Sequence, residues 1–127
     1  MTRVTAILLT YNCERFVEDA LRSVLQQRFD GPLEVIVSDD ASTDGTPQRL
    51  RDVLRGAPSQ YPVRLLQRSV NSGSKSSHLN DVFPRCSGEV LVSFDADDIS
   101  ESDRVAKLVA AFGRQANAQA VYSAYSL

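Results

Sequence analysis

Short apolar runs alternate with helical patterns along the whole chain, and this alternation limits the folds that it can adopt. The apolar runs, rich in β-branched residues, predict strands at residues 4–9, 33–37, 63–66, 89–94 and 120–125. Between them, apolar residues spaced three and four apart predict helices. Strands that alternate with helices form a parallel sheet with right-handed crossovers. We therefore predict one α/β domain, a mostly parallel, Rossmann-like sheet of about five strands with helices on both faces.

Several residues at the predicted helix starts have side chains that commonly cap helices. Asn12 is the predicted N-cap of the first helix, and Thr46 is that of the second, with Pro47 at the first helical position. Ser100 stands three residues before Asp103, a spacing that resembles a capping box. These signals predict where three of the helices begin.

Charge and apolar content exclude two classes of partner. The chain has 127 residues and a formal net charge of −2, so its surface does not attract nucleic acid or an anionic membrane. No segment approaches the roughly 18–20 apolar residues of a membrane span, and residues 1–10 fit a first strand better than a signal peptide. Cys13 and Cys86 are isolated and predicted to be reduced, so we expect a cytoplasmic protein.

Polar and acidic segments follow four of the predicted strands. These segments are residues 10–12, 38–46, 71–75 and 95–98. In an open parallel sheet the carboxyl ends of the strands share one edge, and ligands bind beyond that edge. The sequence therefore predicts a binding site there.

The residues at this edge indicate which ligand chemistry fits. The turn after the first strand, residues 10–14, has no glycine, so the dinucleotide signature G-x-G-x-x-G is absent. Asp95, Asp97 and Asp98 would repel a diphosphate unless a divalent cation lay between them. Mg²⁺ and Mn²⁺ take carboxylate ligands and share the remaining positions with phosphate and water. We predict such a cation at residues 95–98.

Three segments, in order and each at a strand end, resemble family 2 glycosyltransferases of the GT-A fold. Thr10-Tyr11-Asn12 is similar to the family's T-Y-N, and residues 39–46 match its D-D-x-S-x-D-x-T. Residues 95–98 match its D-x-D-D after an apolar strand. The resemblance covers nearly the whole chain and implies a single nucleotide-sugar-binding domain over residues 1–127.

The resemblance also implies roles for individual residues at the base end of the donor. Thr10 and Tyr11 would line the base pocket. Asp40, helped by Asp39, would bind the uracil-like edge of the base. A UDP-sugar is the favoured donor on this resemblance, and guanosine and thymidine donors occur among related enzymes.

At the sugar end, the resemblance places the donor against the acidic segment. Asp95 would approach the ribose or the sugar, and Asp97 would be the leading ligand of Mn²⁺ or Mg²⁺, with Asp98 close by. The cation would stabilise the leaving nucleoside diphosphate while an acceptor hydroxyl attacks with inversion. The resemblance thus implies metal-dependent inverting glycosyl transfer.

The resemblance further implies that the catalytic base and the acceptor-binding part lie downstream of Leu127. The chain would then be truncated and inactive by itself. In the full-length protein the acceptor would be a glycan, a lipid-linked molecule or another hydroxyl compound. We expect that protein to be cytoplasmic, with peripheral binding at the inner face of the membrane as a further expectation.

Each motif also has a purely structural interpretation. Asp39 and Asp40 could form a solvated turn that Asp44 caps, and the three aspartates of residues 95–98 could favour the start of the following helix. His78 is more readily a satisfied polar residue than a ligand or a base. Lys75 is expected to be solvated, although it lies near the predicted phosphate site.

Two functions other than glycosyl transfer are alternatives for a chain of this pattern. A Mg²⁺-binding receiver domain would have its acidic pair after the first strand, where this chain has residues 10–12, so placement argues against it. A binding or regulatory module that kept the fold and lost catalysis stays open.

Overall fold

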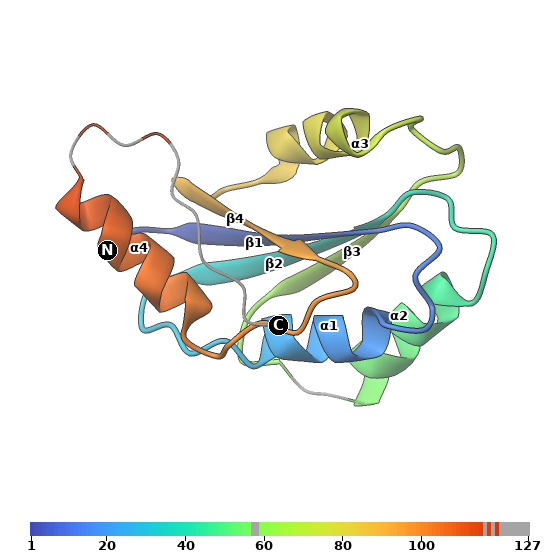
Figure 1. Cartoon of the computed structure of the whole chain (residues 1–127), viewed down its shortest axis with the longest axis horizontal. Coiled ribbons are helices and arrows are strands. Elements are labelled where there is room, and N and C mark those ends of the chain that lie inside the picture. Colours follow the sequence, from blue (N-terminus) through green and yellow to red (C-terminus); the bar gives the residue numbers. More distant parts are fainter. Residues whose placement is uncertain (57–58, 116, 118, 120–127) are drawn as a thin grey trace.

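The computed structural model describes residues 1–56, 59–115, 117 and 119. Four parallel strands form one sheet in the order β3-β2-β1-β4 (Figure 1). Their bounds are β1 Val4–Thr10, β2 Leu33–Asp39, β3 Val63–Gln67 and β4 Val90–Asp95. The predicted parallel sheet is confirmed with these four strands, and the fifth predicted strand, residues 120–125, lies outside the described residues.

Helices cover both faces of the sheet (Figure 1), as predicted. α1 (Val17–Leu25), α2 (Thr46–Gly56) and α4 (Arg104–Arg114) pack on one face, where their apolar residues share a core with the strands. α3 (Lys75–Val82), followed by the 3₁₀ turn η1 (Phe83–Arg85), packs on the other face.

β1 lies between β2 and β4, and all seven of its residues are buried. Ala6 and Leu8 point to the core under α1, α2 and α4, whereas Ile7 and Leu9 point to the smaller core under α3. A strand buried on both faces reads as an unbroken apolar run, because it has no side that faces water. This explains why the first strand is the clearest signal in the sequence.

Two predicted helix caps are wrong because other residues hold those positions. α1 begins at Val17, and Phe16 takes the N-cap position without a side-chain hydrogen bond, so Asn12 caps nothing there. Asn12 instead adopts a positive φ of 47°. At α2, the Asp44 carboxylate accepts hydrogen bonds from the Thr46 backbone nitrogen at 2.9 Å and from its hydroxyl at 2.6 Å. Asp44 is therefore the capping residue, and Thr46 is its partner.

The predicted capping box at the last helix is also wrong. α4 begins at Arg104, and Asp103, at its N-cap position, makes no capping hydrogen bond with its side chain. The backbone nitrogen of Val105 donates instead to Oε1 of Gln27, at 3.0 Å. Gln27 is fully buried, and its amide donates to the Ser23 and Glu101 carbonyl oxygens. The start of α4 is thus capped by a side chain from the segment that follows α1.

Two predictions about the chain as a whole can be compared with the structure. Cys13 and Cys86 are both free. Among the residues described, no helix is long and apolar enough to cross a membrane.

The chain enters β4 by passing very close to β1. Gly88 donates its backbone N–H to the Thr5 hydroxyl at 2.9 Å, and a side chain at Gly88 would collide with the Thr5 backbone nitrogen. Glycine is therefore required here by the close approach of two backbones.

We expect Gly88→Ala to destabilise the fold by about 1–3 kcal/mol, because the added methyl forces β1 and the start of β4 apart. Gly113→Ala is the matched control. Gly113 lies inside α4 with nothing within 4 Å of an added methyl, so the same change should stabilise by up to about 1 kcal/mol. Urea unfolding of both variants measures the free energies. Equal effects of the two substitutions would contradict the assigned contact.

Candidate functional site

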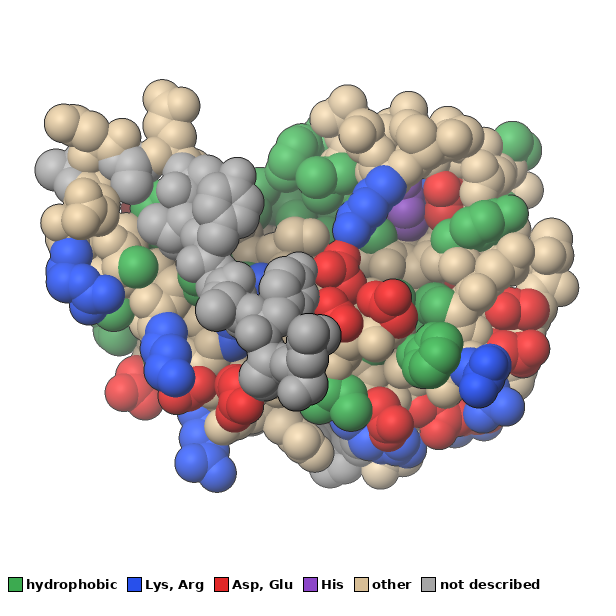
Figure 2. Space-filling model, viewed as in Figure 1, with side chains coloured by type: hydrophobic (Ala, Val, Ile, Leu, Met, Phe, Trp, Pro, Cys, Tyr) green, Lys and Arg blue, Asp and Glu red, His purple; other side chains and the backbone are tan. Residues whose placement is uncertain are grey.

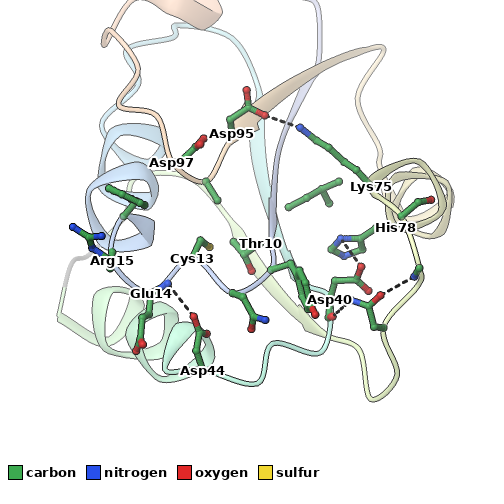
Figure 3. A pocket seen from close by; sticks show the side chains of 18 residues that line it. Thr10, Cys13, Glu14, Arg15, Asp40, Asp44, Lys75, His78, Asp95 and Asp97 are labelled. Carbon is green, nitrogen blue, oxygen red and sulfur yellow. Dashed lines mark hydrogen bonds and ion pairs between the residues drawn. The ribbon is translucent and has the colours of Figure 1, made fainter.

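A cavity of about 650 Å³ lies at the carboxyl ends of β1, β2 and β4. Its wall is built from the segment after β1, from the start of α3 and the loop before it, and from the end of β4 (Figure 3). In the space-filling view, acidic side chains gather there beside a basic side chain (Figure 2). The structure brings these predicted residues to the wall: Thr10, Tyr11, Asp40, Asp95 and Asp97.

Asp39 does not line the cavity and is fully buried beneath it. Its Oδ1 accepts hydrogen bonds from the Thr10 and Ser42 hydroxyls, both at 2.7 Å. Its Oδ2 accepts from the Ser42 backbone nitrogen at 2.9 Å and from Nε2 of Gln67 at 2.8 Å. These four bonds use the acceptor positions of the carboxylate. Asp39 therefore holds the strand ends together and does not reach the ligand space directly.

Asp40 lies on the cavity wall but is only 5% exposed, so a solvated turn is excluded for both aspartates. Its two oxygens accept from Ser72, one from the backbone nitrogen at 2.8 Å and one from the hydroxyl at 2.7 Å. Nε of Arg68 lies 3.3 Å from Oδ1, and the Asn71 amide donates to the Asp40 carbonyl. Asp40 thus anchors the loop that precedes α3.

His78 is 2% exposed and has polar partners on both sides of its ring. Its Nε2 lies 2.8 Å from the Ser38 hydroxyl, and its Nδ1 lies 3.9 Å from Oδ2 of Asp40. Burial lowers the pKa of His78 below 6.5, although the nearby Asp40 carboxylate acts in the opposite direction. The imidazole is therefore neutral at neutral pH. The structure supports the interpretation of His78 as a satisfied polar residue that packs behind Asp40.

The acidic segment after β4 brings three carboxylates into a short stretch of chain. Asp97 is exposed on the cavity wall, and Asp95 and Asp98 are half-buried. Partial burial and the charges of Asp97 and Asp95 raise the pKa of Asp98. α4 begins only at Arg104 and has no acidic residue in its first turn, so these carboxylates do not serve as its helix-start charges.

The donor chemistry of this segment fits a divalent cation shared with a ligand. Within the described part of the chain, no group of three or more His, Cys, Asp and Glu side chains is arranged to hold a metal by itself. Mg²⁺ and Mn²⁺ need only one or two carboxylates when phosphate and water complete the shell. Asp97 and Asp98 could supply those carboxylates.

Some residues at this site were not found from the sequence. Arg68, directly after β3, lies 2.8 Å from Asp81 as well as near Asp40, so it links the end of β3 to α3. Phe16 is 48% exposed and lines the cavity. The signal for Arg68 was its place directly after a strand, at the same edge as the acidic segments.

The comparisons with known proteins decide the family. A family model described as glycosyl transferase family 2 matches residues 5–126. The chain belongs to this family. It is 32% identical over 119 residues to a putative glycosyltransferase, EpsE, of Bacillus subtilis. This match covers 94% of the chain and 41% of the relative. It is 38% identical over 86 residues to a beta-monoglucosyldiacylglycerol synthase of Nostoc, covering 67% of the chain and 18% of the relative.

Solved glycosyltransferases share the fold of this family 2 chain. TarS of S. aureus in complex with UDP superposes with a TM-score of 0.73 at 25% identity, over 95% of this chain and 38% of TarS. The mannosyltransferase PcManGT of Pyrobaculum calidifontis, in complex with GDP-Man and Mn²⁺, gives 0.73 at 35% identity, over 85% and 31%. The predicted GT-A fold is confirmed, and the chain spans less than half the length of these relatives.

The hydrogen bonds of Asp39 predict that replacing its carboxylate with an amide lowers the stability of the fold. In Asp39→Asn an amide would face donors that now meet a carboxylate, and we expect a loss of about 1–3 kcal/mol of folding free energy. Asp97→Asn is the matched control, because Asp97 is exposed, and its effect should stay within about 0.5 kcal/mol. Urea unfolding measures the free energy of unfolding of both variants and so distinguishes them. Similar losses at both positions would show that Asp39 is not the structural carboxylate.

Proposed function

We propose that this chain binds a nucleoside-diphosphate sugar in the cavity at the carboxyl ends of β1, β2 and β4. The observation that carries the proposal is the position of Asp95 and Asp97 on the wall of this cavity in a family 2 chain. The bound molecules of structural neighbours support it, since TarS structures contain UDP or UDP-GlcNAc and PcManGT contains GDP-Man. A UDP-sugar is the favoured donor, with a guanosine donor as the alternative.

The sugar end of the donor is proposed to meet the acidic segment. Asp97 would be the leading ligand of Mn²⁺ or Mg²⁺ with Asp98 beside it, and Asp95 would approach the ribose or the sugar. When bound, the cation would neutralise the two phosphates and the charge of the leaving nucleoside diphosphate. The Mn²⁺ in the PcManGT complex and in a glucosyl-3-phosphoglycerate synthase complex supports this assignment.

The base end is proposed to lie against Tyr11 and Asp40. Tyr11 is 51% exposed on the cavity wall, so its ring face is available for stacking. Oδ2 of Asp40 accepts one hydrogen bond, from the Ser72 hydroxyl, and a carboxylate oxygen can accept a second from a base N–H. The Thr10 hydroxyl donates to Asp39, so Thr10 would shape the pocket and position Asp39.

For the whole protein we propose metal-dependent inverting transfer of the sugar to an acceptor hydroxyl of a glycan, a lipid-linked molecule or another compound. A carboxylate base would deprotonate that hydroxyl, and we place this base and the acceptor-binding part outside the present chain. The short coverage of the relatives, 41% for EpsE, supports this division. The alternative is a donor-binding module without catalysis.

Calorimetric titration of the purified protein with UDP, GDP and TDP, each with and without Mn²⁺, tests the proposal. Metal-dependent binding of one nucleotide would support the donor site and identify the base. The absence of binding by all three nucleotides would overturn donor binding by this chain.

We expect Asp97→Ala to weaken nucleoside-diphosphate binding at least about tenfold in the presence of Mn²⁺, because a carboxylate ligand is lost. Without Mn²⁺ the affinity should not fall. Asp52→Ala, which removes an exposed carboxylate on α2, is the control and should bind like the wild type. Calorimetry gives the affinities, and unchanged binding of Asp97→Ala with Mn²⁺ would remove Asp97 from the metal site.

We expect Asp40→Asn to weaken binding of the nucleotide roughly tenfold, since one charge-assisted hydrogen bond to the base is lost. The dependence on Mn²⁺ should persist. Ser72→Ala separates the two roles of Asp40, because it loosens the loop and keeps the carboxylate. If Ser72→Ala weakened binding as much as Asp40→Asn, Asp40 would act by anchoring the loop and not by reading the base.

A further inference from the structure

An ion pair joins two elements of the cavity wall. Lys75 is the first residue of α3 on one side, and Asp95 is the last residue of β4 on the other (Figure 3). Nζ of Lys75 lies 2.7 Å from Oδ1 of Asp95. The Lys75 side chain is 65% exposed, so the ammonium group keeps contact with water as well. The pair therefore links the start of α3 to the end of β4 at the cavity wall.

The stability of α3 does not account for a lysine at this position. A cation at the start of a helix faces the positive end of the helix dipole, which is unfavourable. The first turn of α3 has no acidic residue to offset it. The serine before Lys75, Ser74, already caps the helix by accepting from the Ser77 backbone nitrogen. Lys75 adds positive charge where the helix end supplies some already.

The other charged residues on the cavity wall do not bring a positive charge into the cavity. Besides Asp95, the acidic residues that line the cavity are Glu14, Asp40, Asp44 and Asp97, and His78 is neutral. The guanidinium of Arg15 lies 5.4 Å from the Phe16 ring centroid, and Figure 3 shows it directed away from the cavity. Among the described residues that line the cavity, Lys75 is thus the cation that reaches into it.

We propose that Lys75 binds the diphosphate of the donor and changes partner when it does so. In the free protein its ammonium group neutralises Asp95. With donor bound, it contacts a phosphate oxygen, and the released Asp95 carboxylate accepts a hydrogen bond from a donor hydroxyl. The exchange is easy because an exposed ion pair is weak and the lysine chain is flexible. This inference rests on the proposed function and adds a diphosphate-binding residue to it.

The test compares Lys75→Met with the wild type on UDP, on uridine and on Mn²⁺ alone. We expect UDP, with Mn²⁺ present, to bind roughly 10- to 100-fold more weakly, as for loss of a charge-assisted hydrogen bond to phosphate. Uridine, measured by ligand NMR at millimolar concentration, has no phosphate and should bind equally to both proteins. Mn²⁺ without nucleotide should bind more tightly to the variant, because Asp95 is no longer neutralised.

Lys107→Met is the matched control, since Lys107 is an exposed lysine on α4 that pairs with Asp103, and it should behave like the wild type. Unchanged UDP affinity in Lys75→Met, or an equal loss for uridine and UDP, would overturn the role of Lys75 and leave the proposed function intact. If the wild type bound none of UDP, GDP and TDP with Mn²⁺, the proposed function would fall and the role of Lys75 with it.

Discussion

A buried carboxylate organises the edge of the sheet where the cavity lies. Asp39 is fully buried, and a buried charge is tolerated only when hydrogen bonds replace the water that it has lost. Two of its partners, Thr10 and Gln67, are its register neighbours on β1 and β3. The third, Ser42, lies in the loop after β2. Satisfying one charge therefore fixes three strand ends and one loop together.

Neighbouring aspartates have different roles because the chain turns between them. Asp39 is the last residue of β2 and points into the protein, whereas Asp40 comes after the strand and points to the cavity and the loop before α3. Asp97 lies farther out and is exposed. An aspartate at this edge thus stabilises the scaffold, anchors a loop or faces the ligand space, according to how deeply its side chain is buried. The three family motifs meet at this edge because parallel strands end on the same side.

The sequence predicts the features that depend on neighbouring residues and misses those that depend on distant ones. The four described strands lie within two residues of their predicted bounds, since an apolar run records its own burial. The predicted cap of α4 was wrong because the backbone nitrogen of Val105 donates to Gln27, which is 78 residues away. The acidic segments at the strand ends correctly predicted the edge of the sheet at which the cavity lies. The sequence could not tell that Asp39 is buried or that Lys75 pairs with Asp95, because both follow from the packing of separate segments.

The free protein must hold several carboxylates near one another before any ligand binds. Burial and the neighbouring aspartates raise the pKa of Asp98, which records this crowding, and Lys75 offsets part of it at Asp95. A cation at Asp97 and a diphosphate at Lys75 would each relieve charge that the other leaves uncompensated. Coupling of this kind is reciprocal, so the cation must strengthen nucleotide binding by the same factor as the nucleotide strengthens binding of the cation. The proposed donor and metal sites are therefore one electrostatic unit, and neither is complete without the other.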